Sequence, residues 1–301
     1  MRLPGEARSY LAGALSRERI RVLPVLSRYQ AQELLAGREA RAASVATSLD
    51  LGRVQTEVAL EDGGALLPDG EVLGWATVEK IAASENQCFA VDGGEARAIQ
   101  VFSDTTNWAR SLYPTRGAPT TLVAGFPMHR IKDTDPWEDT RTKVAALAPI
   151  RGNALDTATG LGYTAIELAR TARRVTTIEY DPAALELARL NPWSRELFDN
   201  PAITQIVGDA FEVIQSFEGD AFDRILHDPP TFSLAGELYS EAFYRELCRV
   251  LAKGGCLFHY IGDPGSKFGK RMTTGVVRRL REAGFRRVVA RPEAFGVLAY
   301  K

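Results

Sequence analysis

Short apolar runs alternate with amphipathic segments through the second half of the chain. The apolar runs predict strands that end at Asp156 and over Val175–Glu179, Ile203–Val207, Phe222–His227 and Cys256–Ile261. The segments between and after them predict helices over Ala183–Leu190, Tyr239–Leu251 and Thr274–Ala283. The Gly254-Gly255 pair is expected to end the second of these helices. Arg286–Ala290 and Gly296–Tyr300 predict a closing hairpin. This alternation indicates an α/β fold with a doubly wound, Rossmann-like sheet of seven strands.

The first part of the chain has a different pattern. Turn signals at Asp62-Gly63-Gly64, Pro68-Asp69-Gly70 and Asp92-Gly93-Gly94 separate short apolar runs and predict antiparallel hairpins. Helices are expected over Arg28–Ala36 and Trp75–Ala83. We therefore expect a smaller amino-terminal α+β domain over residues 1–140, with a possible role in substrate recognition, and a second domain over residues 141–301.

A glycine-rich loop follows the strand that ends at Asp156. Gly160 and Gly162 allow a tight turn into a helix and a close approach of the backbone to a ligand. The run Gly160–Ala165 also fits the dinucleotide fingerprint, with Glu179 about 20 residues later, so a nicotinamide cofactor is one alternative. The second alternative is S-adenosylmethionine. Asp156 favours it, because a carboxylate repels a pyrophosphate but suits the ammonium group of S-adenosylmethionine.

Acidic residues end the next strands as well. If the cofactor is S-adenosylmethionine, Glu179 would accept hydrogen bonds from the ribose hydroxyls, and Asp209 would accept one from the adenine amino group. Ala210 and Phe211 would lie beside the adenine ring. Each acid alone could instead be a helix cap. The expected cofactor-binding residues are Asp156, Ala158, Thr159, Gly160, Gly162, Tyr163, Thr164, Glu179, Tyr180, Asp209, Ala210 and Phe211.

With Asp228 at a fourth strand end, this order of acids resembles the class I S-adenosylmethionine-dependent methyltransferases, over roughly residues 140–301. Asp228-Pro229-Pro230-Thr231-Phe232 resembles the Asp/Asn-Pro-Pro-aromatic motif of enzymes that methylate exocyclic amines of bases or amide nitrogens. The Asp228 carboxylate and the Pro229 carbonyl would accept the two N–H hydrogens of such an amine, held by two prolines of fixed φ.

The motif departs from that pattern at one position. Thr231 stands where the family has the aromatic residue that stacks on the target base, so Phe232 is expected to stack instead. We expect Asp228, Pro229, Pro230 and Phe232 to form the catalytic corner. His227, just before it, is either a substrate contact or a core histidine bonded to backbone, and the second interpretation is favoured.

Other chemistry finds less support in the sequence. Methylation at a ring carbon of cytosine would need a nucleophilic cysteine, whereas Cys88, Cys248 and Cys256 fit apolar core positions. No cysteine pair has metal-ligand spacing. The acids between Asp133 and Asp139 are explained by the dipole of a following helix, so no metal is expected.

Several segments point to RNA as the substrate. Nearly the whole chain resembles a family of predicted methyltransferases common in archaea, and this resemblance implies N4-methylation of cytidine in ribosomal RNA. It is carried by Asn191-Pro192-Trp193-Ser194, His227-Asp228-Pro229-Pro230, Gly236-Glu237-Leu238-Tyr239-Ser240 and the glycine-rich loop. A single-stranded or loop region is the expected target, because the base must leave any stack to reach the cofactor.

Charge is distributed unevenly along a chain whose net charge is −1. From Pro264 onward, ten Lys or Arg stand against two Glu, which indicates a phosphate-binding surface or, alternatively, a solvated helix face. The segments Thr106–Thr115 and Phe126–Arg130 mix polar and aromatic residues, as in a binding surface or a structured linker. Expected substrate-binding residues, besides His227, are Asn107, Tyr113, His129, Lys267, Lys270 and Arg271.

Length and composition complete the prediction. A chain of 301 residues that is 45% hydrophobic can form two cores. Three cysteines, no leader and no long apolar stretch favour the cytoplasm. Three alternatives stay open: an aminopropyltransferase or other small-molecule transferase on the same fold, a protein-amide methyltransferase, and a binding module that holds cofactor without turnover.

Overall fold

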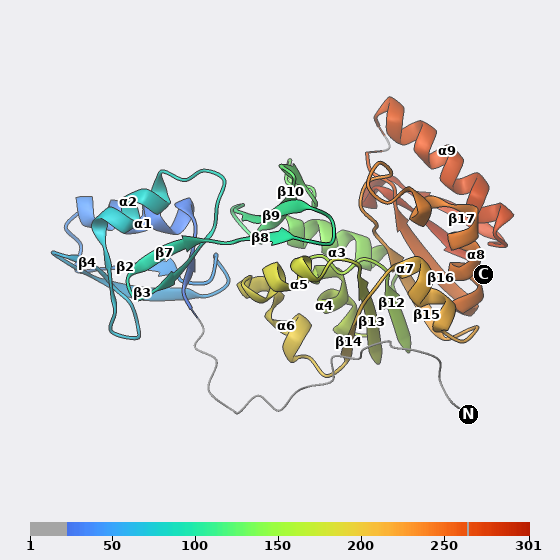
Figure 1. Ribbon diagram of the computed structural model, residues 1–301, viewed down its shortest axis with the longest axis horizontal. Coiled ribbons are helices and arrows are strands. Elements are labelled where there is room, and N and C mark those ends of the chain that lie inside the picture. Colours follow the sequence, from blue (N-terminus) through green and yellow to red (C-terminus); the bar gives the residue numbers. More distant parts are fainter. Residues whose placement is uncertain (1–22, 264) are drawn as a thin grey trace.

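The computed structural model describes residues 23–263 and 265–301 (Figure 1). The carboxyl-terminal part is built on a sheet of seven strands in the order β14-β13-β12-β15-β16-β18-β17. Its strands are β12 (Asn153–Asp156), β13 (Arg174–Glu179), β14 (Ile203–Val207), β15 (Phe222–His227), β16 (Leu251–Tyr260), β17 (Arg287–Arg291) and β18 (Gly296–Tyr300). The pairings among β12–β16 are parallel, and β18 is antiparallel to β16 and β17. The predicted doubly wound sheet and its closing hairpin are confirmed.

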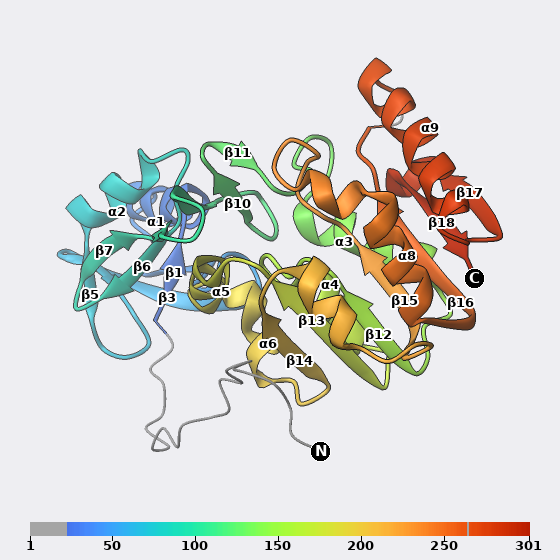
Figure 2. The ribbon, with the colours of Figure 1, turned by 45° about the vertical axis from the view of Figure 1, so that its right-hand side comes forward.

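Helices cover both faces of this sheet (Figures 1 and 2). Those near the start of the domain are α3 (Pro136–Ala146), α4 (Tyr163–Ala169), α5 (Pro182–Arg189) and α6 (Arg195–Asp199), and those that follow are α7 (Ala210–Val213), α8 (Glu241–Val250) and α9 (Lys267–Glu282). Short 3-10 turns are η1 (Pro192–Ser194), η2 (Ile214–Ser216), η3 (Gly236–Tyr239) and η4 (Pro292–Ala294). Asp135 caps α3 and Glu138 and Asp139 lie in its first turn, as expected for acids near a helix dipole.

The predicted stop at Gly254-Gly255 is wrong. Helix α8 ends at Val250, and the glycines lie inside β16, which begins at Leu251. Gly254 adopts a φ of +75°, and the pairing of β15 with β16 shifts register between Phe222 and Arg224. A left-handed glycine here bends the strand, so the pair marks an irregularity in the strand.

The amino-terminal part is made of small antiparallel sheets with two helices, α1 (Arg28–Glu39) and α2 (Trp75–Ala82). One sheet has the order β2-β3-β4-β5, formed by Ser44–Ser48, Gln55–Glu61, Gly64–Leu66 and Val72–Gly74. Another has the order β1-β6-β7, formed by Val25–Leu26, Phe89–Asp92 and Glu95–Ala98. The hairpins fall at the predicted glycine turns, and both predicted helices are present.

A third small sheet connects the two parts (Figure 2). Its strand order is β11-β10-β9-β8. The strands are β8 (Gln100–Ser103), β9 (Trp108–Tyr113), β10 (Thr120–Val123) and β11 (Phe126–Pro127). Leu112 of β9 and Ala118 of the loop between β9 and β10 belong to the same buried cluster as Tyr163 and Ile166 of α4. The predicted boundary after residue 140 falls within α3, so the packing is continuous across it. No helix in the described ranges is long and apolar enough to cross a membrane.

Candidate active site

The carboxyl ends of β12, β13, β14 and β15 lie at one edge of the sheet, because these strands are parallel neighbours. Asp156, Glu179, Asp209 and Asp228 stand at or directly beyond these four ends. In open parallel sheets, ligands bind outside the carboxyl ends where the strand order reverses, and here that point lies between β12 and β15. The fold therefore brings the four predicted acids to the edge where a ligand is expected.

Glu179 is held by the backbone. Its Oε2 accepts from the Gly160 N–H at 2.8 Å and its Oε1 from the Asp181 N–H at 2.9 Å. Burial raises the pKa of Glu179, while these two donors act in the opposite direction. The glycine-rich loop is thereby fastened to the end of β13, and each oxygen retains acceptor capacity for a ligand hydroxyl.

Asp156 lies beneath the glycine-rich loop and is fully buried. Its Oδ2 accepts from the hydroxyls of Thr164 at 3.0 Å and Thr177 at 2.8 Å, and its Oδ1 has no partner among the described residues. Burial raises the pKa of Asp156 to about 7, against the two hydroxyl donors. A buried carboxylate oxygen without a donor is costly unless a cation or donor comes near it, so its position fits a cationic ligand.

The other predicted cofactor residues divide into two groups. Ala158, Gly160, Asp209 and Phe211 are partly exposed, and Tyr180 is well exposed. Asp209 also caps α7, since its Oδ1 accepts from the Phe211 N–H at 2.7 Å. The partly or well exposed residues can therefore contact a ligand directly. The second group is buried and comprises Thr159, Gly162, Thr164 and Ala210, together with Tyr163.

The Tyr163 side chain is placed differently from the prediction. It is 1% exposed, its hydroxyl donates to the Pro119 carbonyl at 2.9 Å, and Asn191 donates to that hydroxyl at 2.8 Å. Its ring lies 5.3 Å from that of His129. Tyr163 therefore joins the seven-stranded part to the connecting sheet, and its side chain is directed into the core.

The Asp228-Pro229-Pro230 corner leaves acceptors free. Asp228 Oδ2 pairs with Lys143 Nζ at 2.7 Å, while its Oδ1 has no bond to a described residue and the side chain is 19% exposed. The Pro229 carbonyl likewise accepts from no described residue, whereas the Pro230 carbonyl accepts from the Tyr239 hydroxyl at 3.0 Å. The corner thus presents two unfilled acceptors on a backbone held by a tyrosine.

Phe232 follows on an exposed loop. Its side chain is 48% exposed and meets the Tyr239 ring edge to face at 5.6 Å. Thr231 Oγ1 bonds Ser233 Oγ at 3.0 Å, so the position after the second proline is part of a turn. Phe232 is thus an exposed aromatic side chain two residues beyond Pro230, and its stacking on a base stays a prediction.

His227 lies in the core. It is 0% exposed, its Nε2 donates to the Leu238 carbonyl at 3.0 Å, and its Nδ1 bonds Thr157 Oγ1 at 2.7 Å. Burial lowers its pKa to about 3. The position supports the core interpretation and leaves no ring nitrogen for a substrate.

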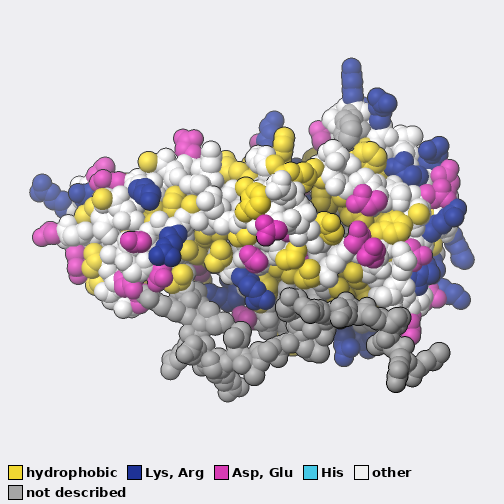
Figure 3. Space-filling view, viewed as in Figure 1, with side chains coloured by type: hydrophobic (Ala, Val, Ile, Leu, Met, Phe, Trp, Pro, Cys, Tyr) yellow, Lys and Arg dark blue, Asp and Glu magenta, His cyan; other side chains and the backbone are white. Residues whose placement is uncertain are grey.

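The remaining predicted substrate residues are spread over the molecule. His129 interacts electrostatically with Lys143 and Asp139, and burial lowers its pKa to about 3. Asn107 is exposed in the β8–β9 turn, beside Thr106, which bonds Asp181 at 3.2 Å. Tyr113 is half-buried at the end of β9. Lys267, Lys270 and Arg271 are exposed on the first turns of α9, and basic side chains gather along that edge in Figure 3.

Sequence reasoning missed a chain of charges beside Asp228. Lys143 Nζ also pairs with Asp139 Oδ2 at 2.8 Å, Arg130 pairs with Asp139 Oδ1 at 2.9 Å, and the Tyr260 ring centre lies 4.2 Å from Lys143 Nζ. Lys143 and Asp139 are almost fully buried. Their i, i+4 spacing predicts a shared helix face, but no local signal indicated that this face meets the Asp-Pro-Pro corner.

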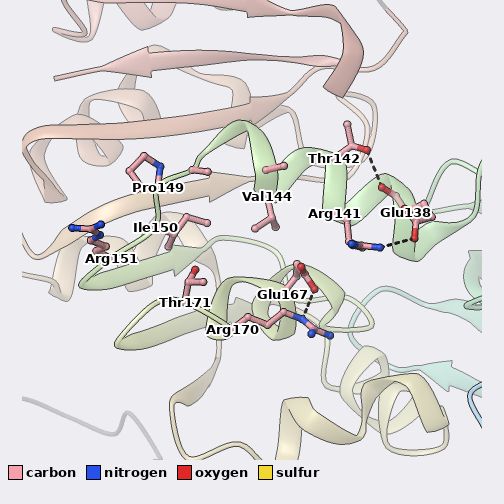
Figure 4. A pocket seen from close by; sticks show the side chains of 12 residues that line it. Glu138, Arg141, Thr142, Val144, Pro149, Ile150, Arg151, Glu167, Arg170 and Thr171 are labelled. Carbon is pink, nitrogen blue, oxygen red and sulfur yellow. Dashed lines mark hydrogen bonds and ion pairs between the residues drawn. The ribbon is translucent and has the colours of Figure 1, made fainter.

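A groove of about 800 Å³ lies elsewhere, between α3 and α4 (Figure 4). Its rim carries Arg141, paired with Glu138 at 3.0 Å, and Arg170, paired with Glu167 at 2.6 Å. It contains none of the predicted cofactor or catalytic residues. Cys88 and Cys256 are buried, and the described residues contain no group of three His, Cys, Asp or Glu arranged to hold a metal ion.

Residues 154–255 match the family described as a methyltransferase domain. Uncharacterized protein MJ1233 of Methanocaldococcus jannaschii is 46% identical over 239 residues, which cover 79% of this chain and 81% of that protein. A polyamine aminopropyltransferase of Mycobacterium tuberculosis is 32% identical over 135 residues, 42% of this chain and 25% of that protein. Spermidine synthase from Thermotoga maritima has a similar structure, with a TM-score of 0.52 and 20% identity over 66% of this chain and 70% of that one.

These likenesses agree with the strand-end geometry. The structural similarity shows the fold, and the domain match assigns S-adenosylmethionine as the cofactor. Asp156 with its unpaired oxygen, Glu179 and Asp209 fit that cofactor. The chain belongs to the same family as the Methanocaldococcus jannaschii protein, and its carboxyl-terminal part matches a methyltransferase domain and has the class I S-adenosylmethionine-dependent methyltransferase fold.

Proposed function

We propose that this protein methylates an exocyclic amine of an RNA base, with N4 of cytidine in ribosomal RNA as the target. The observation that carries the proposal is the pair of unfilled acceptors at the corner, Asp228 Oδ1 and the Pro229 carbonyl. An exocyclic amine has two N–H hydrogens and a lone pair delocalised into the ring. Two fixed acceptors would turn that lone pair out of the ring plane and towards an electrophile.

Each residue of the corner then has a defined task. Bound S-adenosylmethionine supplies an electrophilic methyl group. Pro229 and Pro230 hold the acceptors, Tyr239 fixes the Pro230 carbonyl, and Phe232 would stack on the base. Asp228 Oδ1 would hold the proton that the amine gives up. Cys256 is not placed for a covalent intermediate, since it lies in the core and burial raises its pKa to about 11.

The charges at the corner favour a neutral amine over a polyamine. The aminopropyltransferase among the relatives acts, by its name, with polyamines, whose amino groups are protonated at neutral pH. A site for such cations needs carboxylates that are free to pair with them. Here Asp228 and Asp139 already share the ammonium group of Lys143, and Asp139 also pairs with Arg130. Aminopropyl transfer remains the second candidate, supported by sequence similarity.

Basic residues support RNA as the carrier of that amine. Lys267, Lys270 and Arg271 are exposed at the start of α9, which follows β16 and so begins on the carboxyl-end side of the sheet. Arg278 and Arg281 continue the exposed charge along the helix. Phosphates of a strand whose base enters the corner would lie within reach of such a surface.

The test uses purified protein and labelled S-adenosylmethionine. Label should enter total RNA from cells that lack the enzyme, and mass spectrometry of its nucleosides should show N4-methylcytidine. Asp228→Ala should remove the product and retain cofactor binding, which also excludes a module that binds without turnover. Label in protein instead of RNA would mean amide methylation, and transfer to putrescine from decarboxylated cofactor would mean aminopropylation. Either of these two results, without RNA methylation, overturns the proposal.

A further inference from the structure

Lys143 is a charged residue that lies almost fully inside the protein. It lies in the last turn of α3, and its ammonium group is 3% exposed and touches Asp228 Oδ2 at 2.7 Å and Asp139 Oδ2 at 2.8 Å. Burial alone would lower the pKa of Lys143, but the carboxylates of Asp228 and Asp139 raise it. A buried ammonium costs free energy unless it is paired on all sides, so the two carboxylates explain how it is retained.

The contact is selective for one oxygen of Asp228. Lys143 takes Oδ2, and Oδ1 remains without a described partner on a side chain that is 19% exposed. A carboxylate held at one oxygen by a fixed cation cannot rotate freely, so the direction of the second oxygen is set. Lys143 of α3, which lies outside the Asp-Pro-Pro motif, therefore sets the orientation of the Asp228 oxygen that would accept from the target amine.

We propose that Lys143 is a positioning and specificity-determining residue, which fixes Asp228 through Oδ2, leaves Oδ1 for the target amine and favours a neutral amine over an ammonium group. This inference rests on the proposed function. The balance of charge supports it, because Arg130, Asp139, Lys143 and Asp228 together carry no net charge. A cationic substrate would add an uncompensated charge next to a buried ammonium.

Several groups face Asp228 and determine its ionisation. Burial raises the pKa of Asp228, Lys143 lowers it, and Asp139 raises it. Asp156, Tyr239 and Tyr260 also interact electrostatically with Asp228. Arg130 pairs with Asp139 and so affects Asp228 indirectly, and His129 is neutral beside Lys143. Removing the ammonium group would leave Asp139 paired with Arg130 and Asp228 without a counter-ion, so the pKa of Asp228 would rise.

The experiment measures kcat/KM for RNA methylation between pH 5 and 9 in wild type and four variants. In Lys143→Met the acidic limb should move upward by about 1–3 pH units, because Asp228 loses its counter-ion. Asp139→Asn should move that limb downward, and Lys143→Arg should restore most of the wild-type profile. Lys80→Met, which removes an exposed lysine of α2, is the matched control and should leave the profile unchanged. A merely structural lysine would lower activity equally at every pH.

A second measurement needs no methyl transfer. Calorimetric titration with putrescine should show at least about tenfold tighter binding to Lys143→Met than to wild type, because the two carboxylates become available. If wild type does not methylate RNA, the proposed function fails, and this titration still tests Lys143. If Lys143→Met does not fold, the opposite shift in Asp139→Asn carries the test. The inference is overturned if the pH profile of Lys143→Met or that of Asp139→Asn coincides with the wild-type profile. It is also overturned if wild type binds putrescine more tightly than Lys143→Met.

Discussion

The two ends of the ligand edge hold their carboxylates in different ways. At the cofactor end, Glu179 and Asp156 are held by backbone N–H groups and threonine hydroxyls, and no cation among the described side chains pairs with either. At the target end, Asp228 pairs with a buried ammonium group. A carboxylate held by neutral donors can still receive a cationic ligand, whereas one that is already paired is better suited to a neutral one. The same residue type at equivalent strand ends thus serves two tasks, and its surroundings decide which.

The largest expected effect separates the two ends by function. Asp228→Ala should lower methyl transfer by about 10²–10³-fold, as does removal of one transition-state hydrogen-bonding group, and leave the dissociation constant of S-adenosylmethionine within about twofold. Glu179→Ala should weaken cofactor binding by about 10–100-fold, because its charge-assisted hydrogen bonds to the ligand can no longer form. Calorimetry and single-turnover rates measure both. Equal weakening of binding in the two variants would contradict the division.

The glycines of the cofactor loop allow a sharper comparison. Gly162 has a φ of +78°, and a Cβ there would lie 2.5 Å from Leu197 Cδ2, whereas Gly160 has a φ of +52° with no atom near its Cβ position. Gly162→Ala should therefore destabilise the fold by about 2–4 kcal/mol, from backbone strain and overpacking. Gly160→Ala should cost about 1–2 kcal/mol, from strain alone. Denaturant unfolding of both variants measures the difference, and similar costs would show that the approach to Leu197 is unimportant.

The buried Asp156 predicts a pH dependence at the cofactor end. Its pKa is about 7 in the folded protein and near 3.8 when unfolded, so the folded state binds the extra proton between these values. The stabilising contribution of Asp156 is complete below pH 4 and is lost as the pH rises through 7. The stability of wild type relative to Asp156→Asn should fall by at least about 1 kcal/mol over that range. Thermal unfolding at matched pH values tests this, and parallel curves would contradict it.

The smallest effect concerns the basic surface of α9. Neutralising Lys267, Lys270 and Arg271 should weaken RNA binding at low salt and reduce the slope of log affinity against log salt by about 0.7–0.9 for each phosphate that these side chains neutralise in wild type. Cofactor affinity should not change. Fluorescence anisotropy at several salt concentrations measures the slope. Neutralising the exposed residues Arg41, Lys80 and Arg97 of the amino-terminal part provides a control of equal charge, and an equal effect there would place the RNA elsewhere.

Strands with clear borders were well predicted from sequence. Ile203–Val207 and Phe222–His227 have the predicted bounds, because glycine, aspartate or proline stands beside runs of β-forming residues. The border at Gly254-Gly255 was wrong, since a glycine pair can end a helix or bend a strand, and only pairing with β15 decides between them. The same limit applies to Tyr163, which was expected among the cofactor-binding residues, although Asn191 and Pro119 hold its side chain in the core.

The sequence by itself determined the sheet, the four acids at its edge and the rigid proline corner, because these follow from local periodicity and turn chemistry. Tertiary structure decided what each acid faces. It buried Asp156 beneath a loop, directed His227 into the core and brought Lys143 from α3 to Asp228, 85 residues away in the chain. Such contacts depend on how a helix packs across a sheet, and that packing is set by side chains distant in sequence. Ionisation and substrate charge preference arise from it.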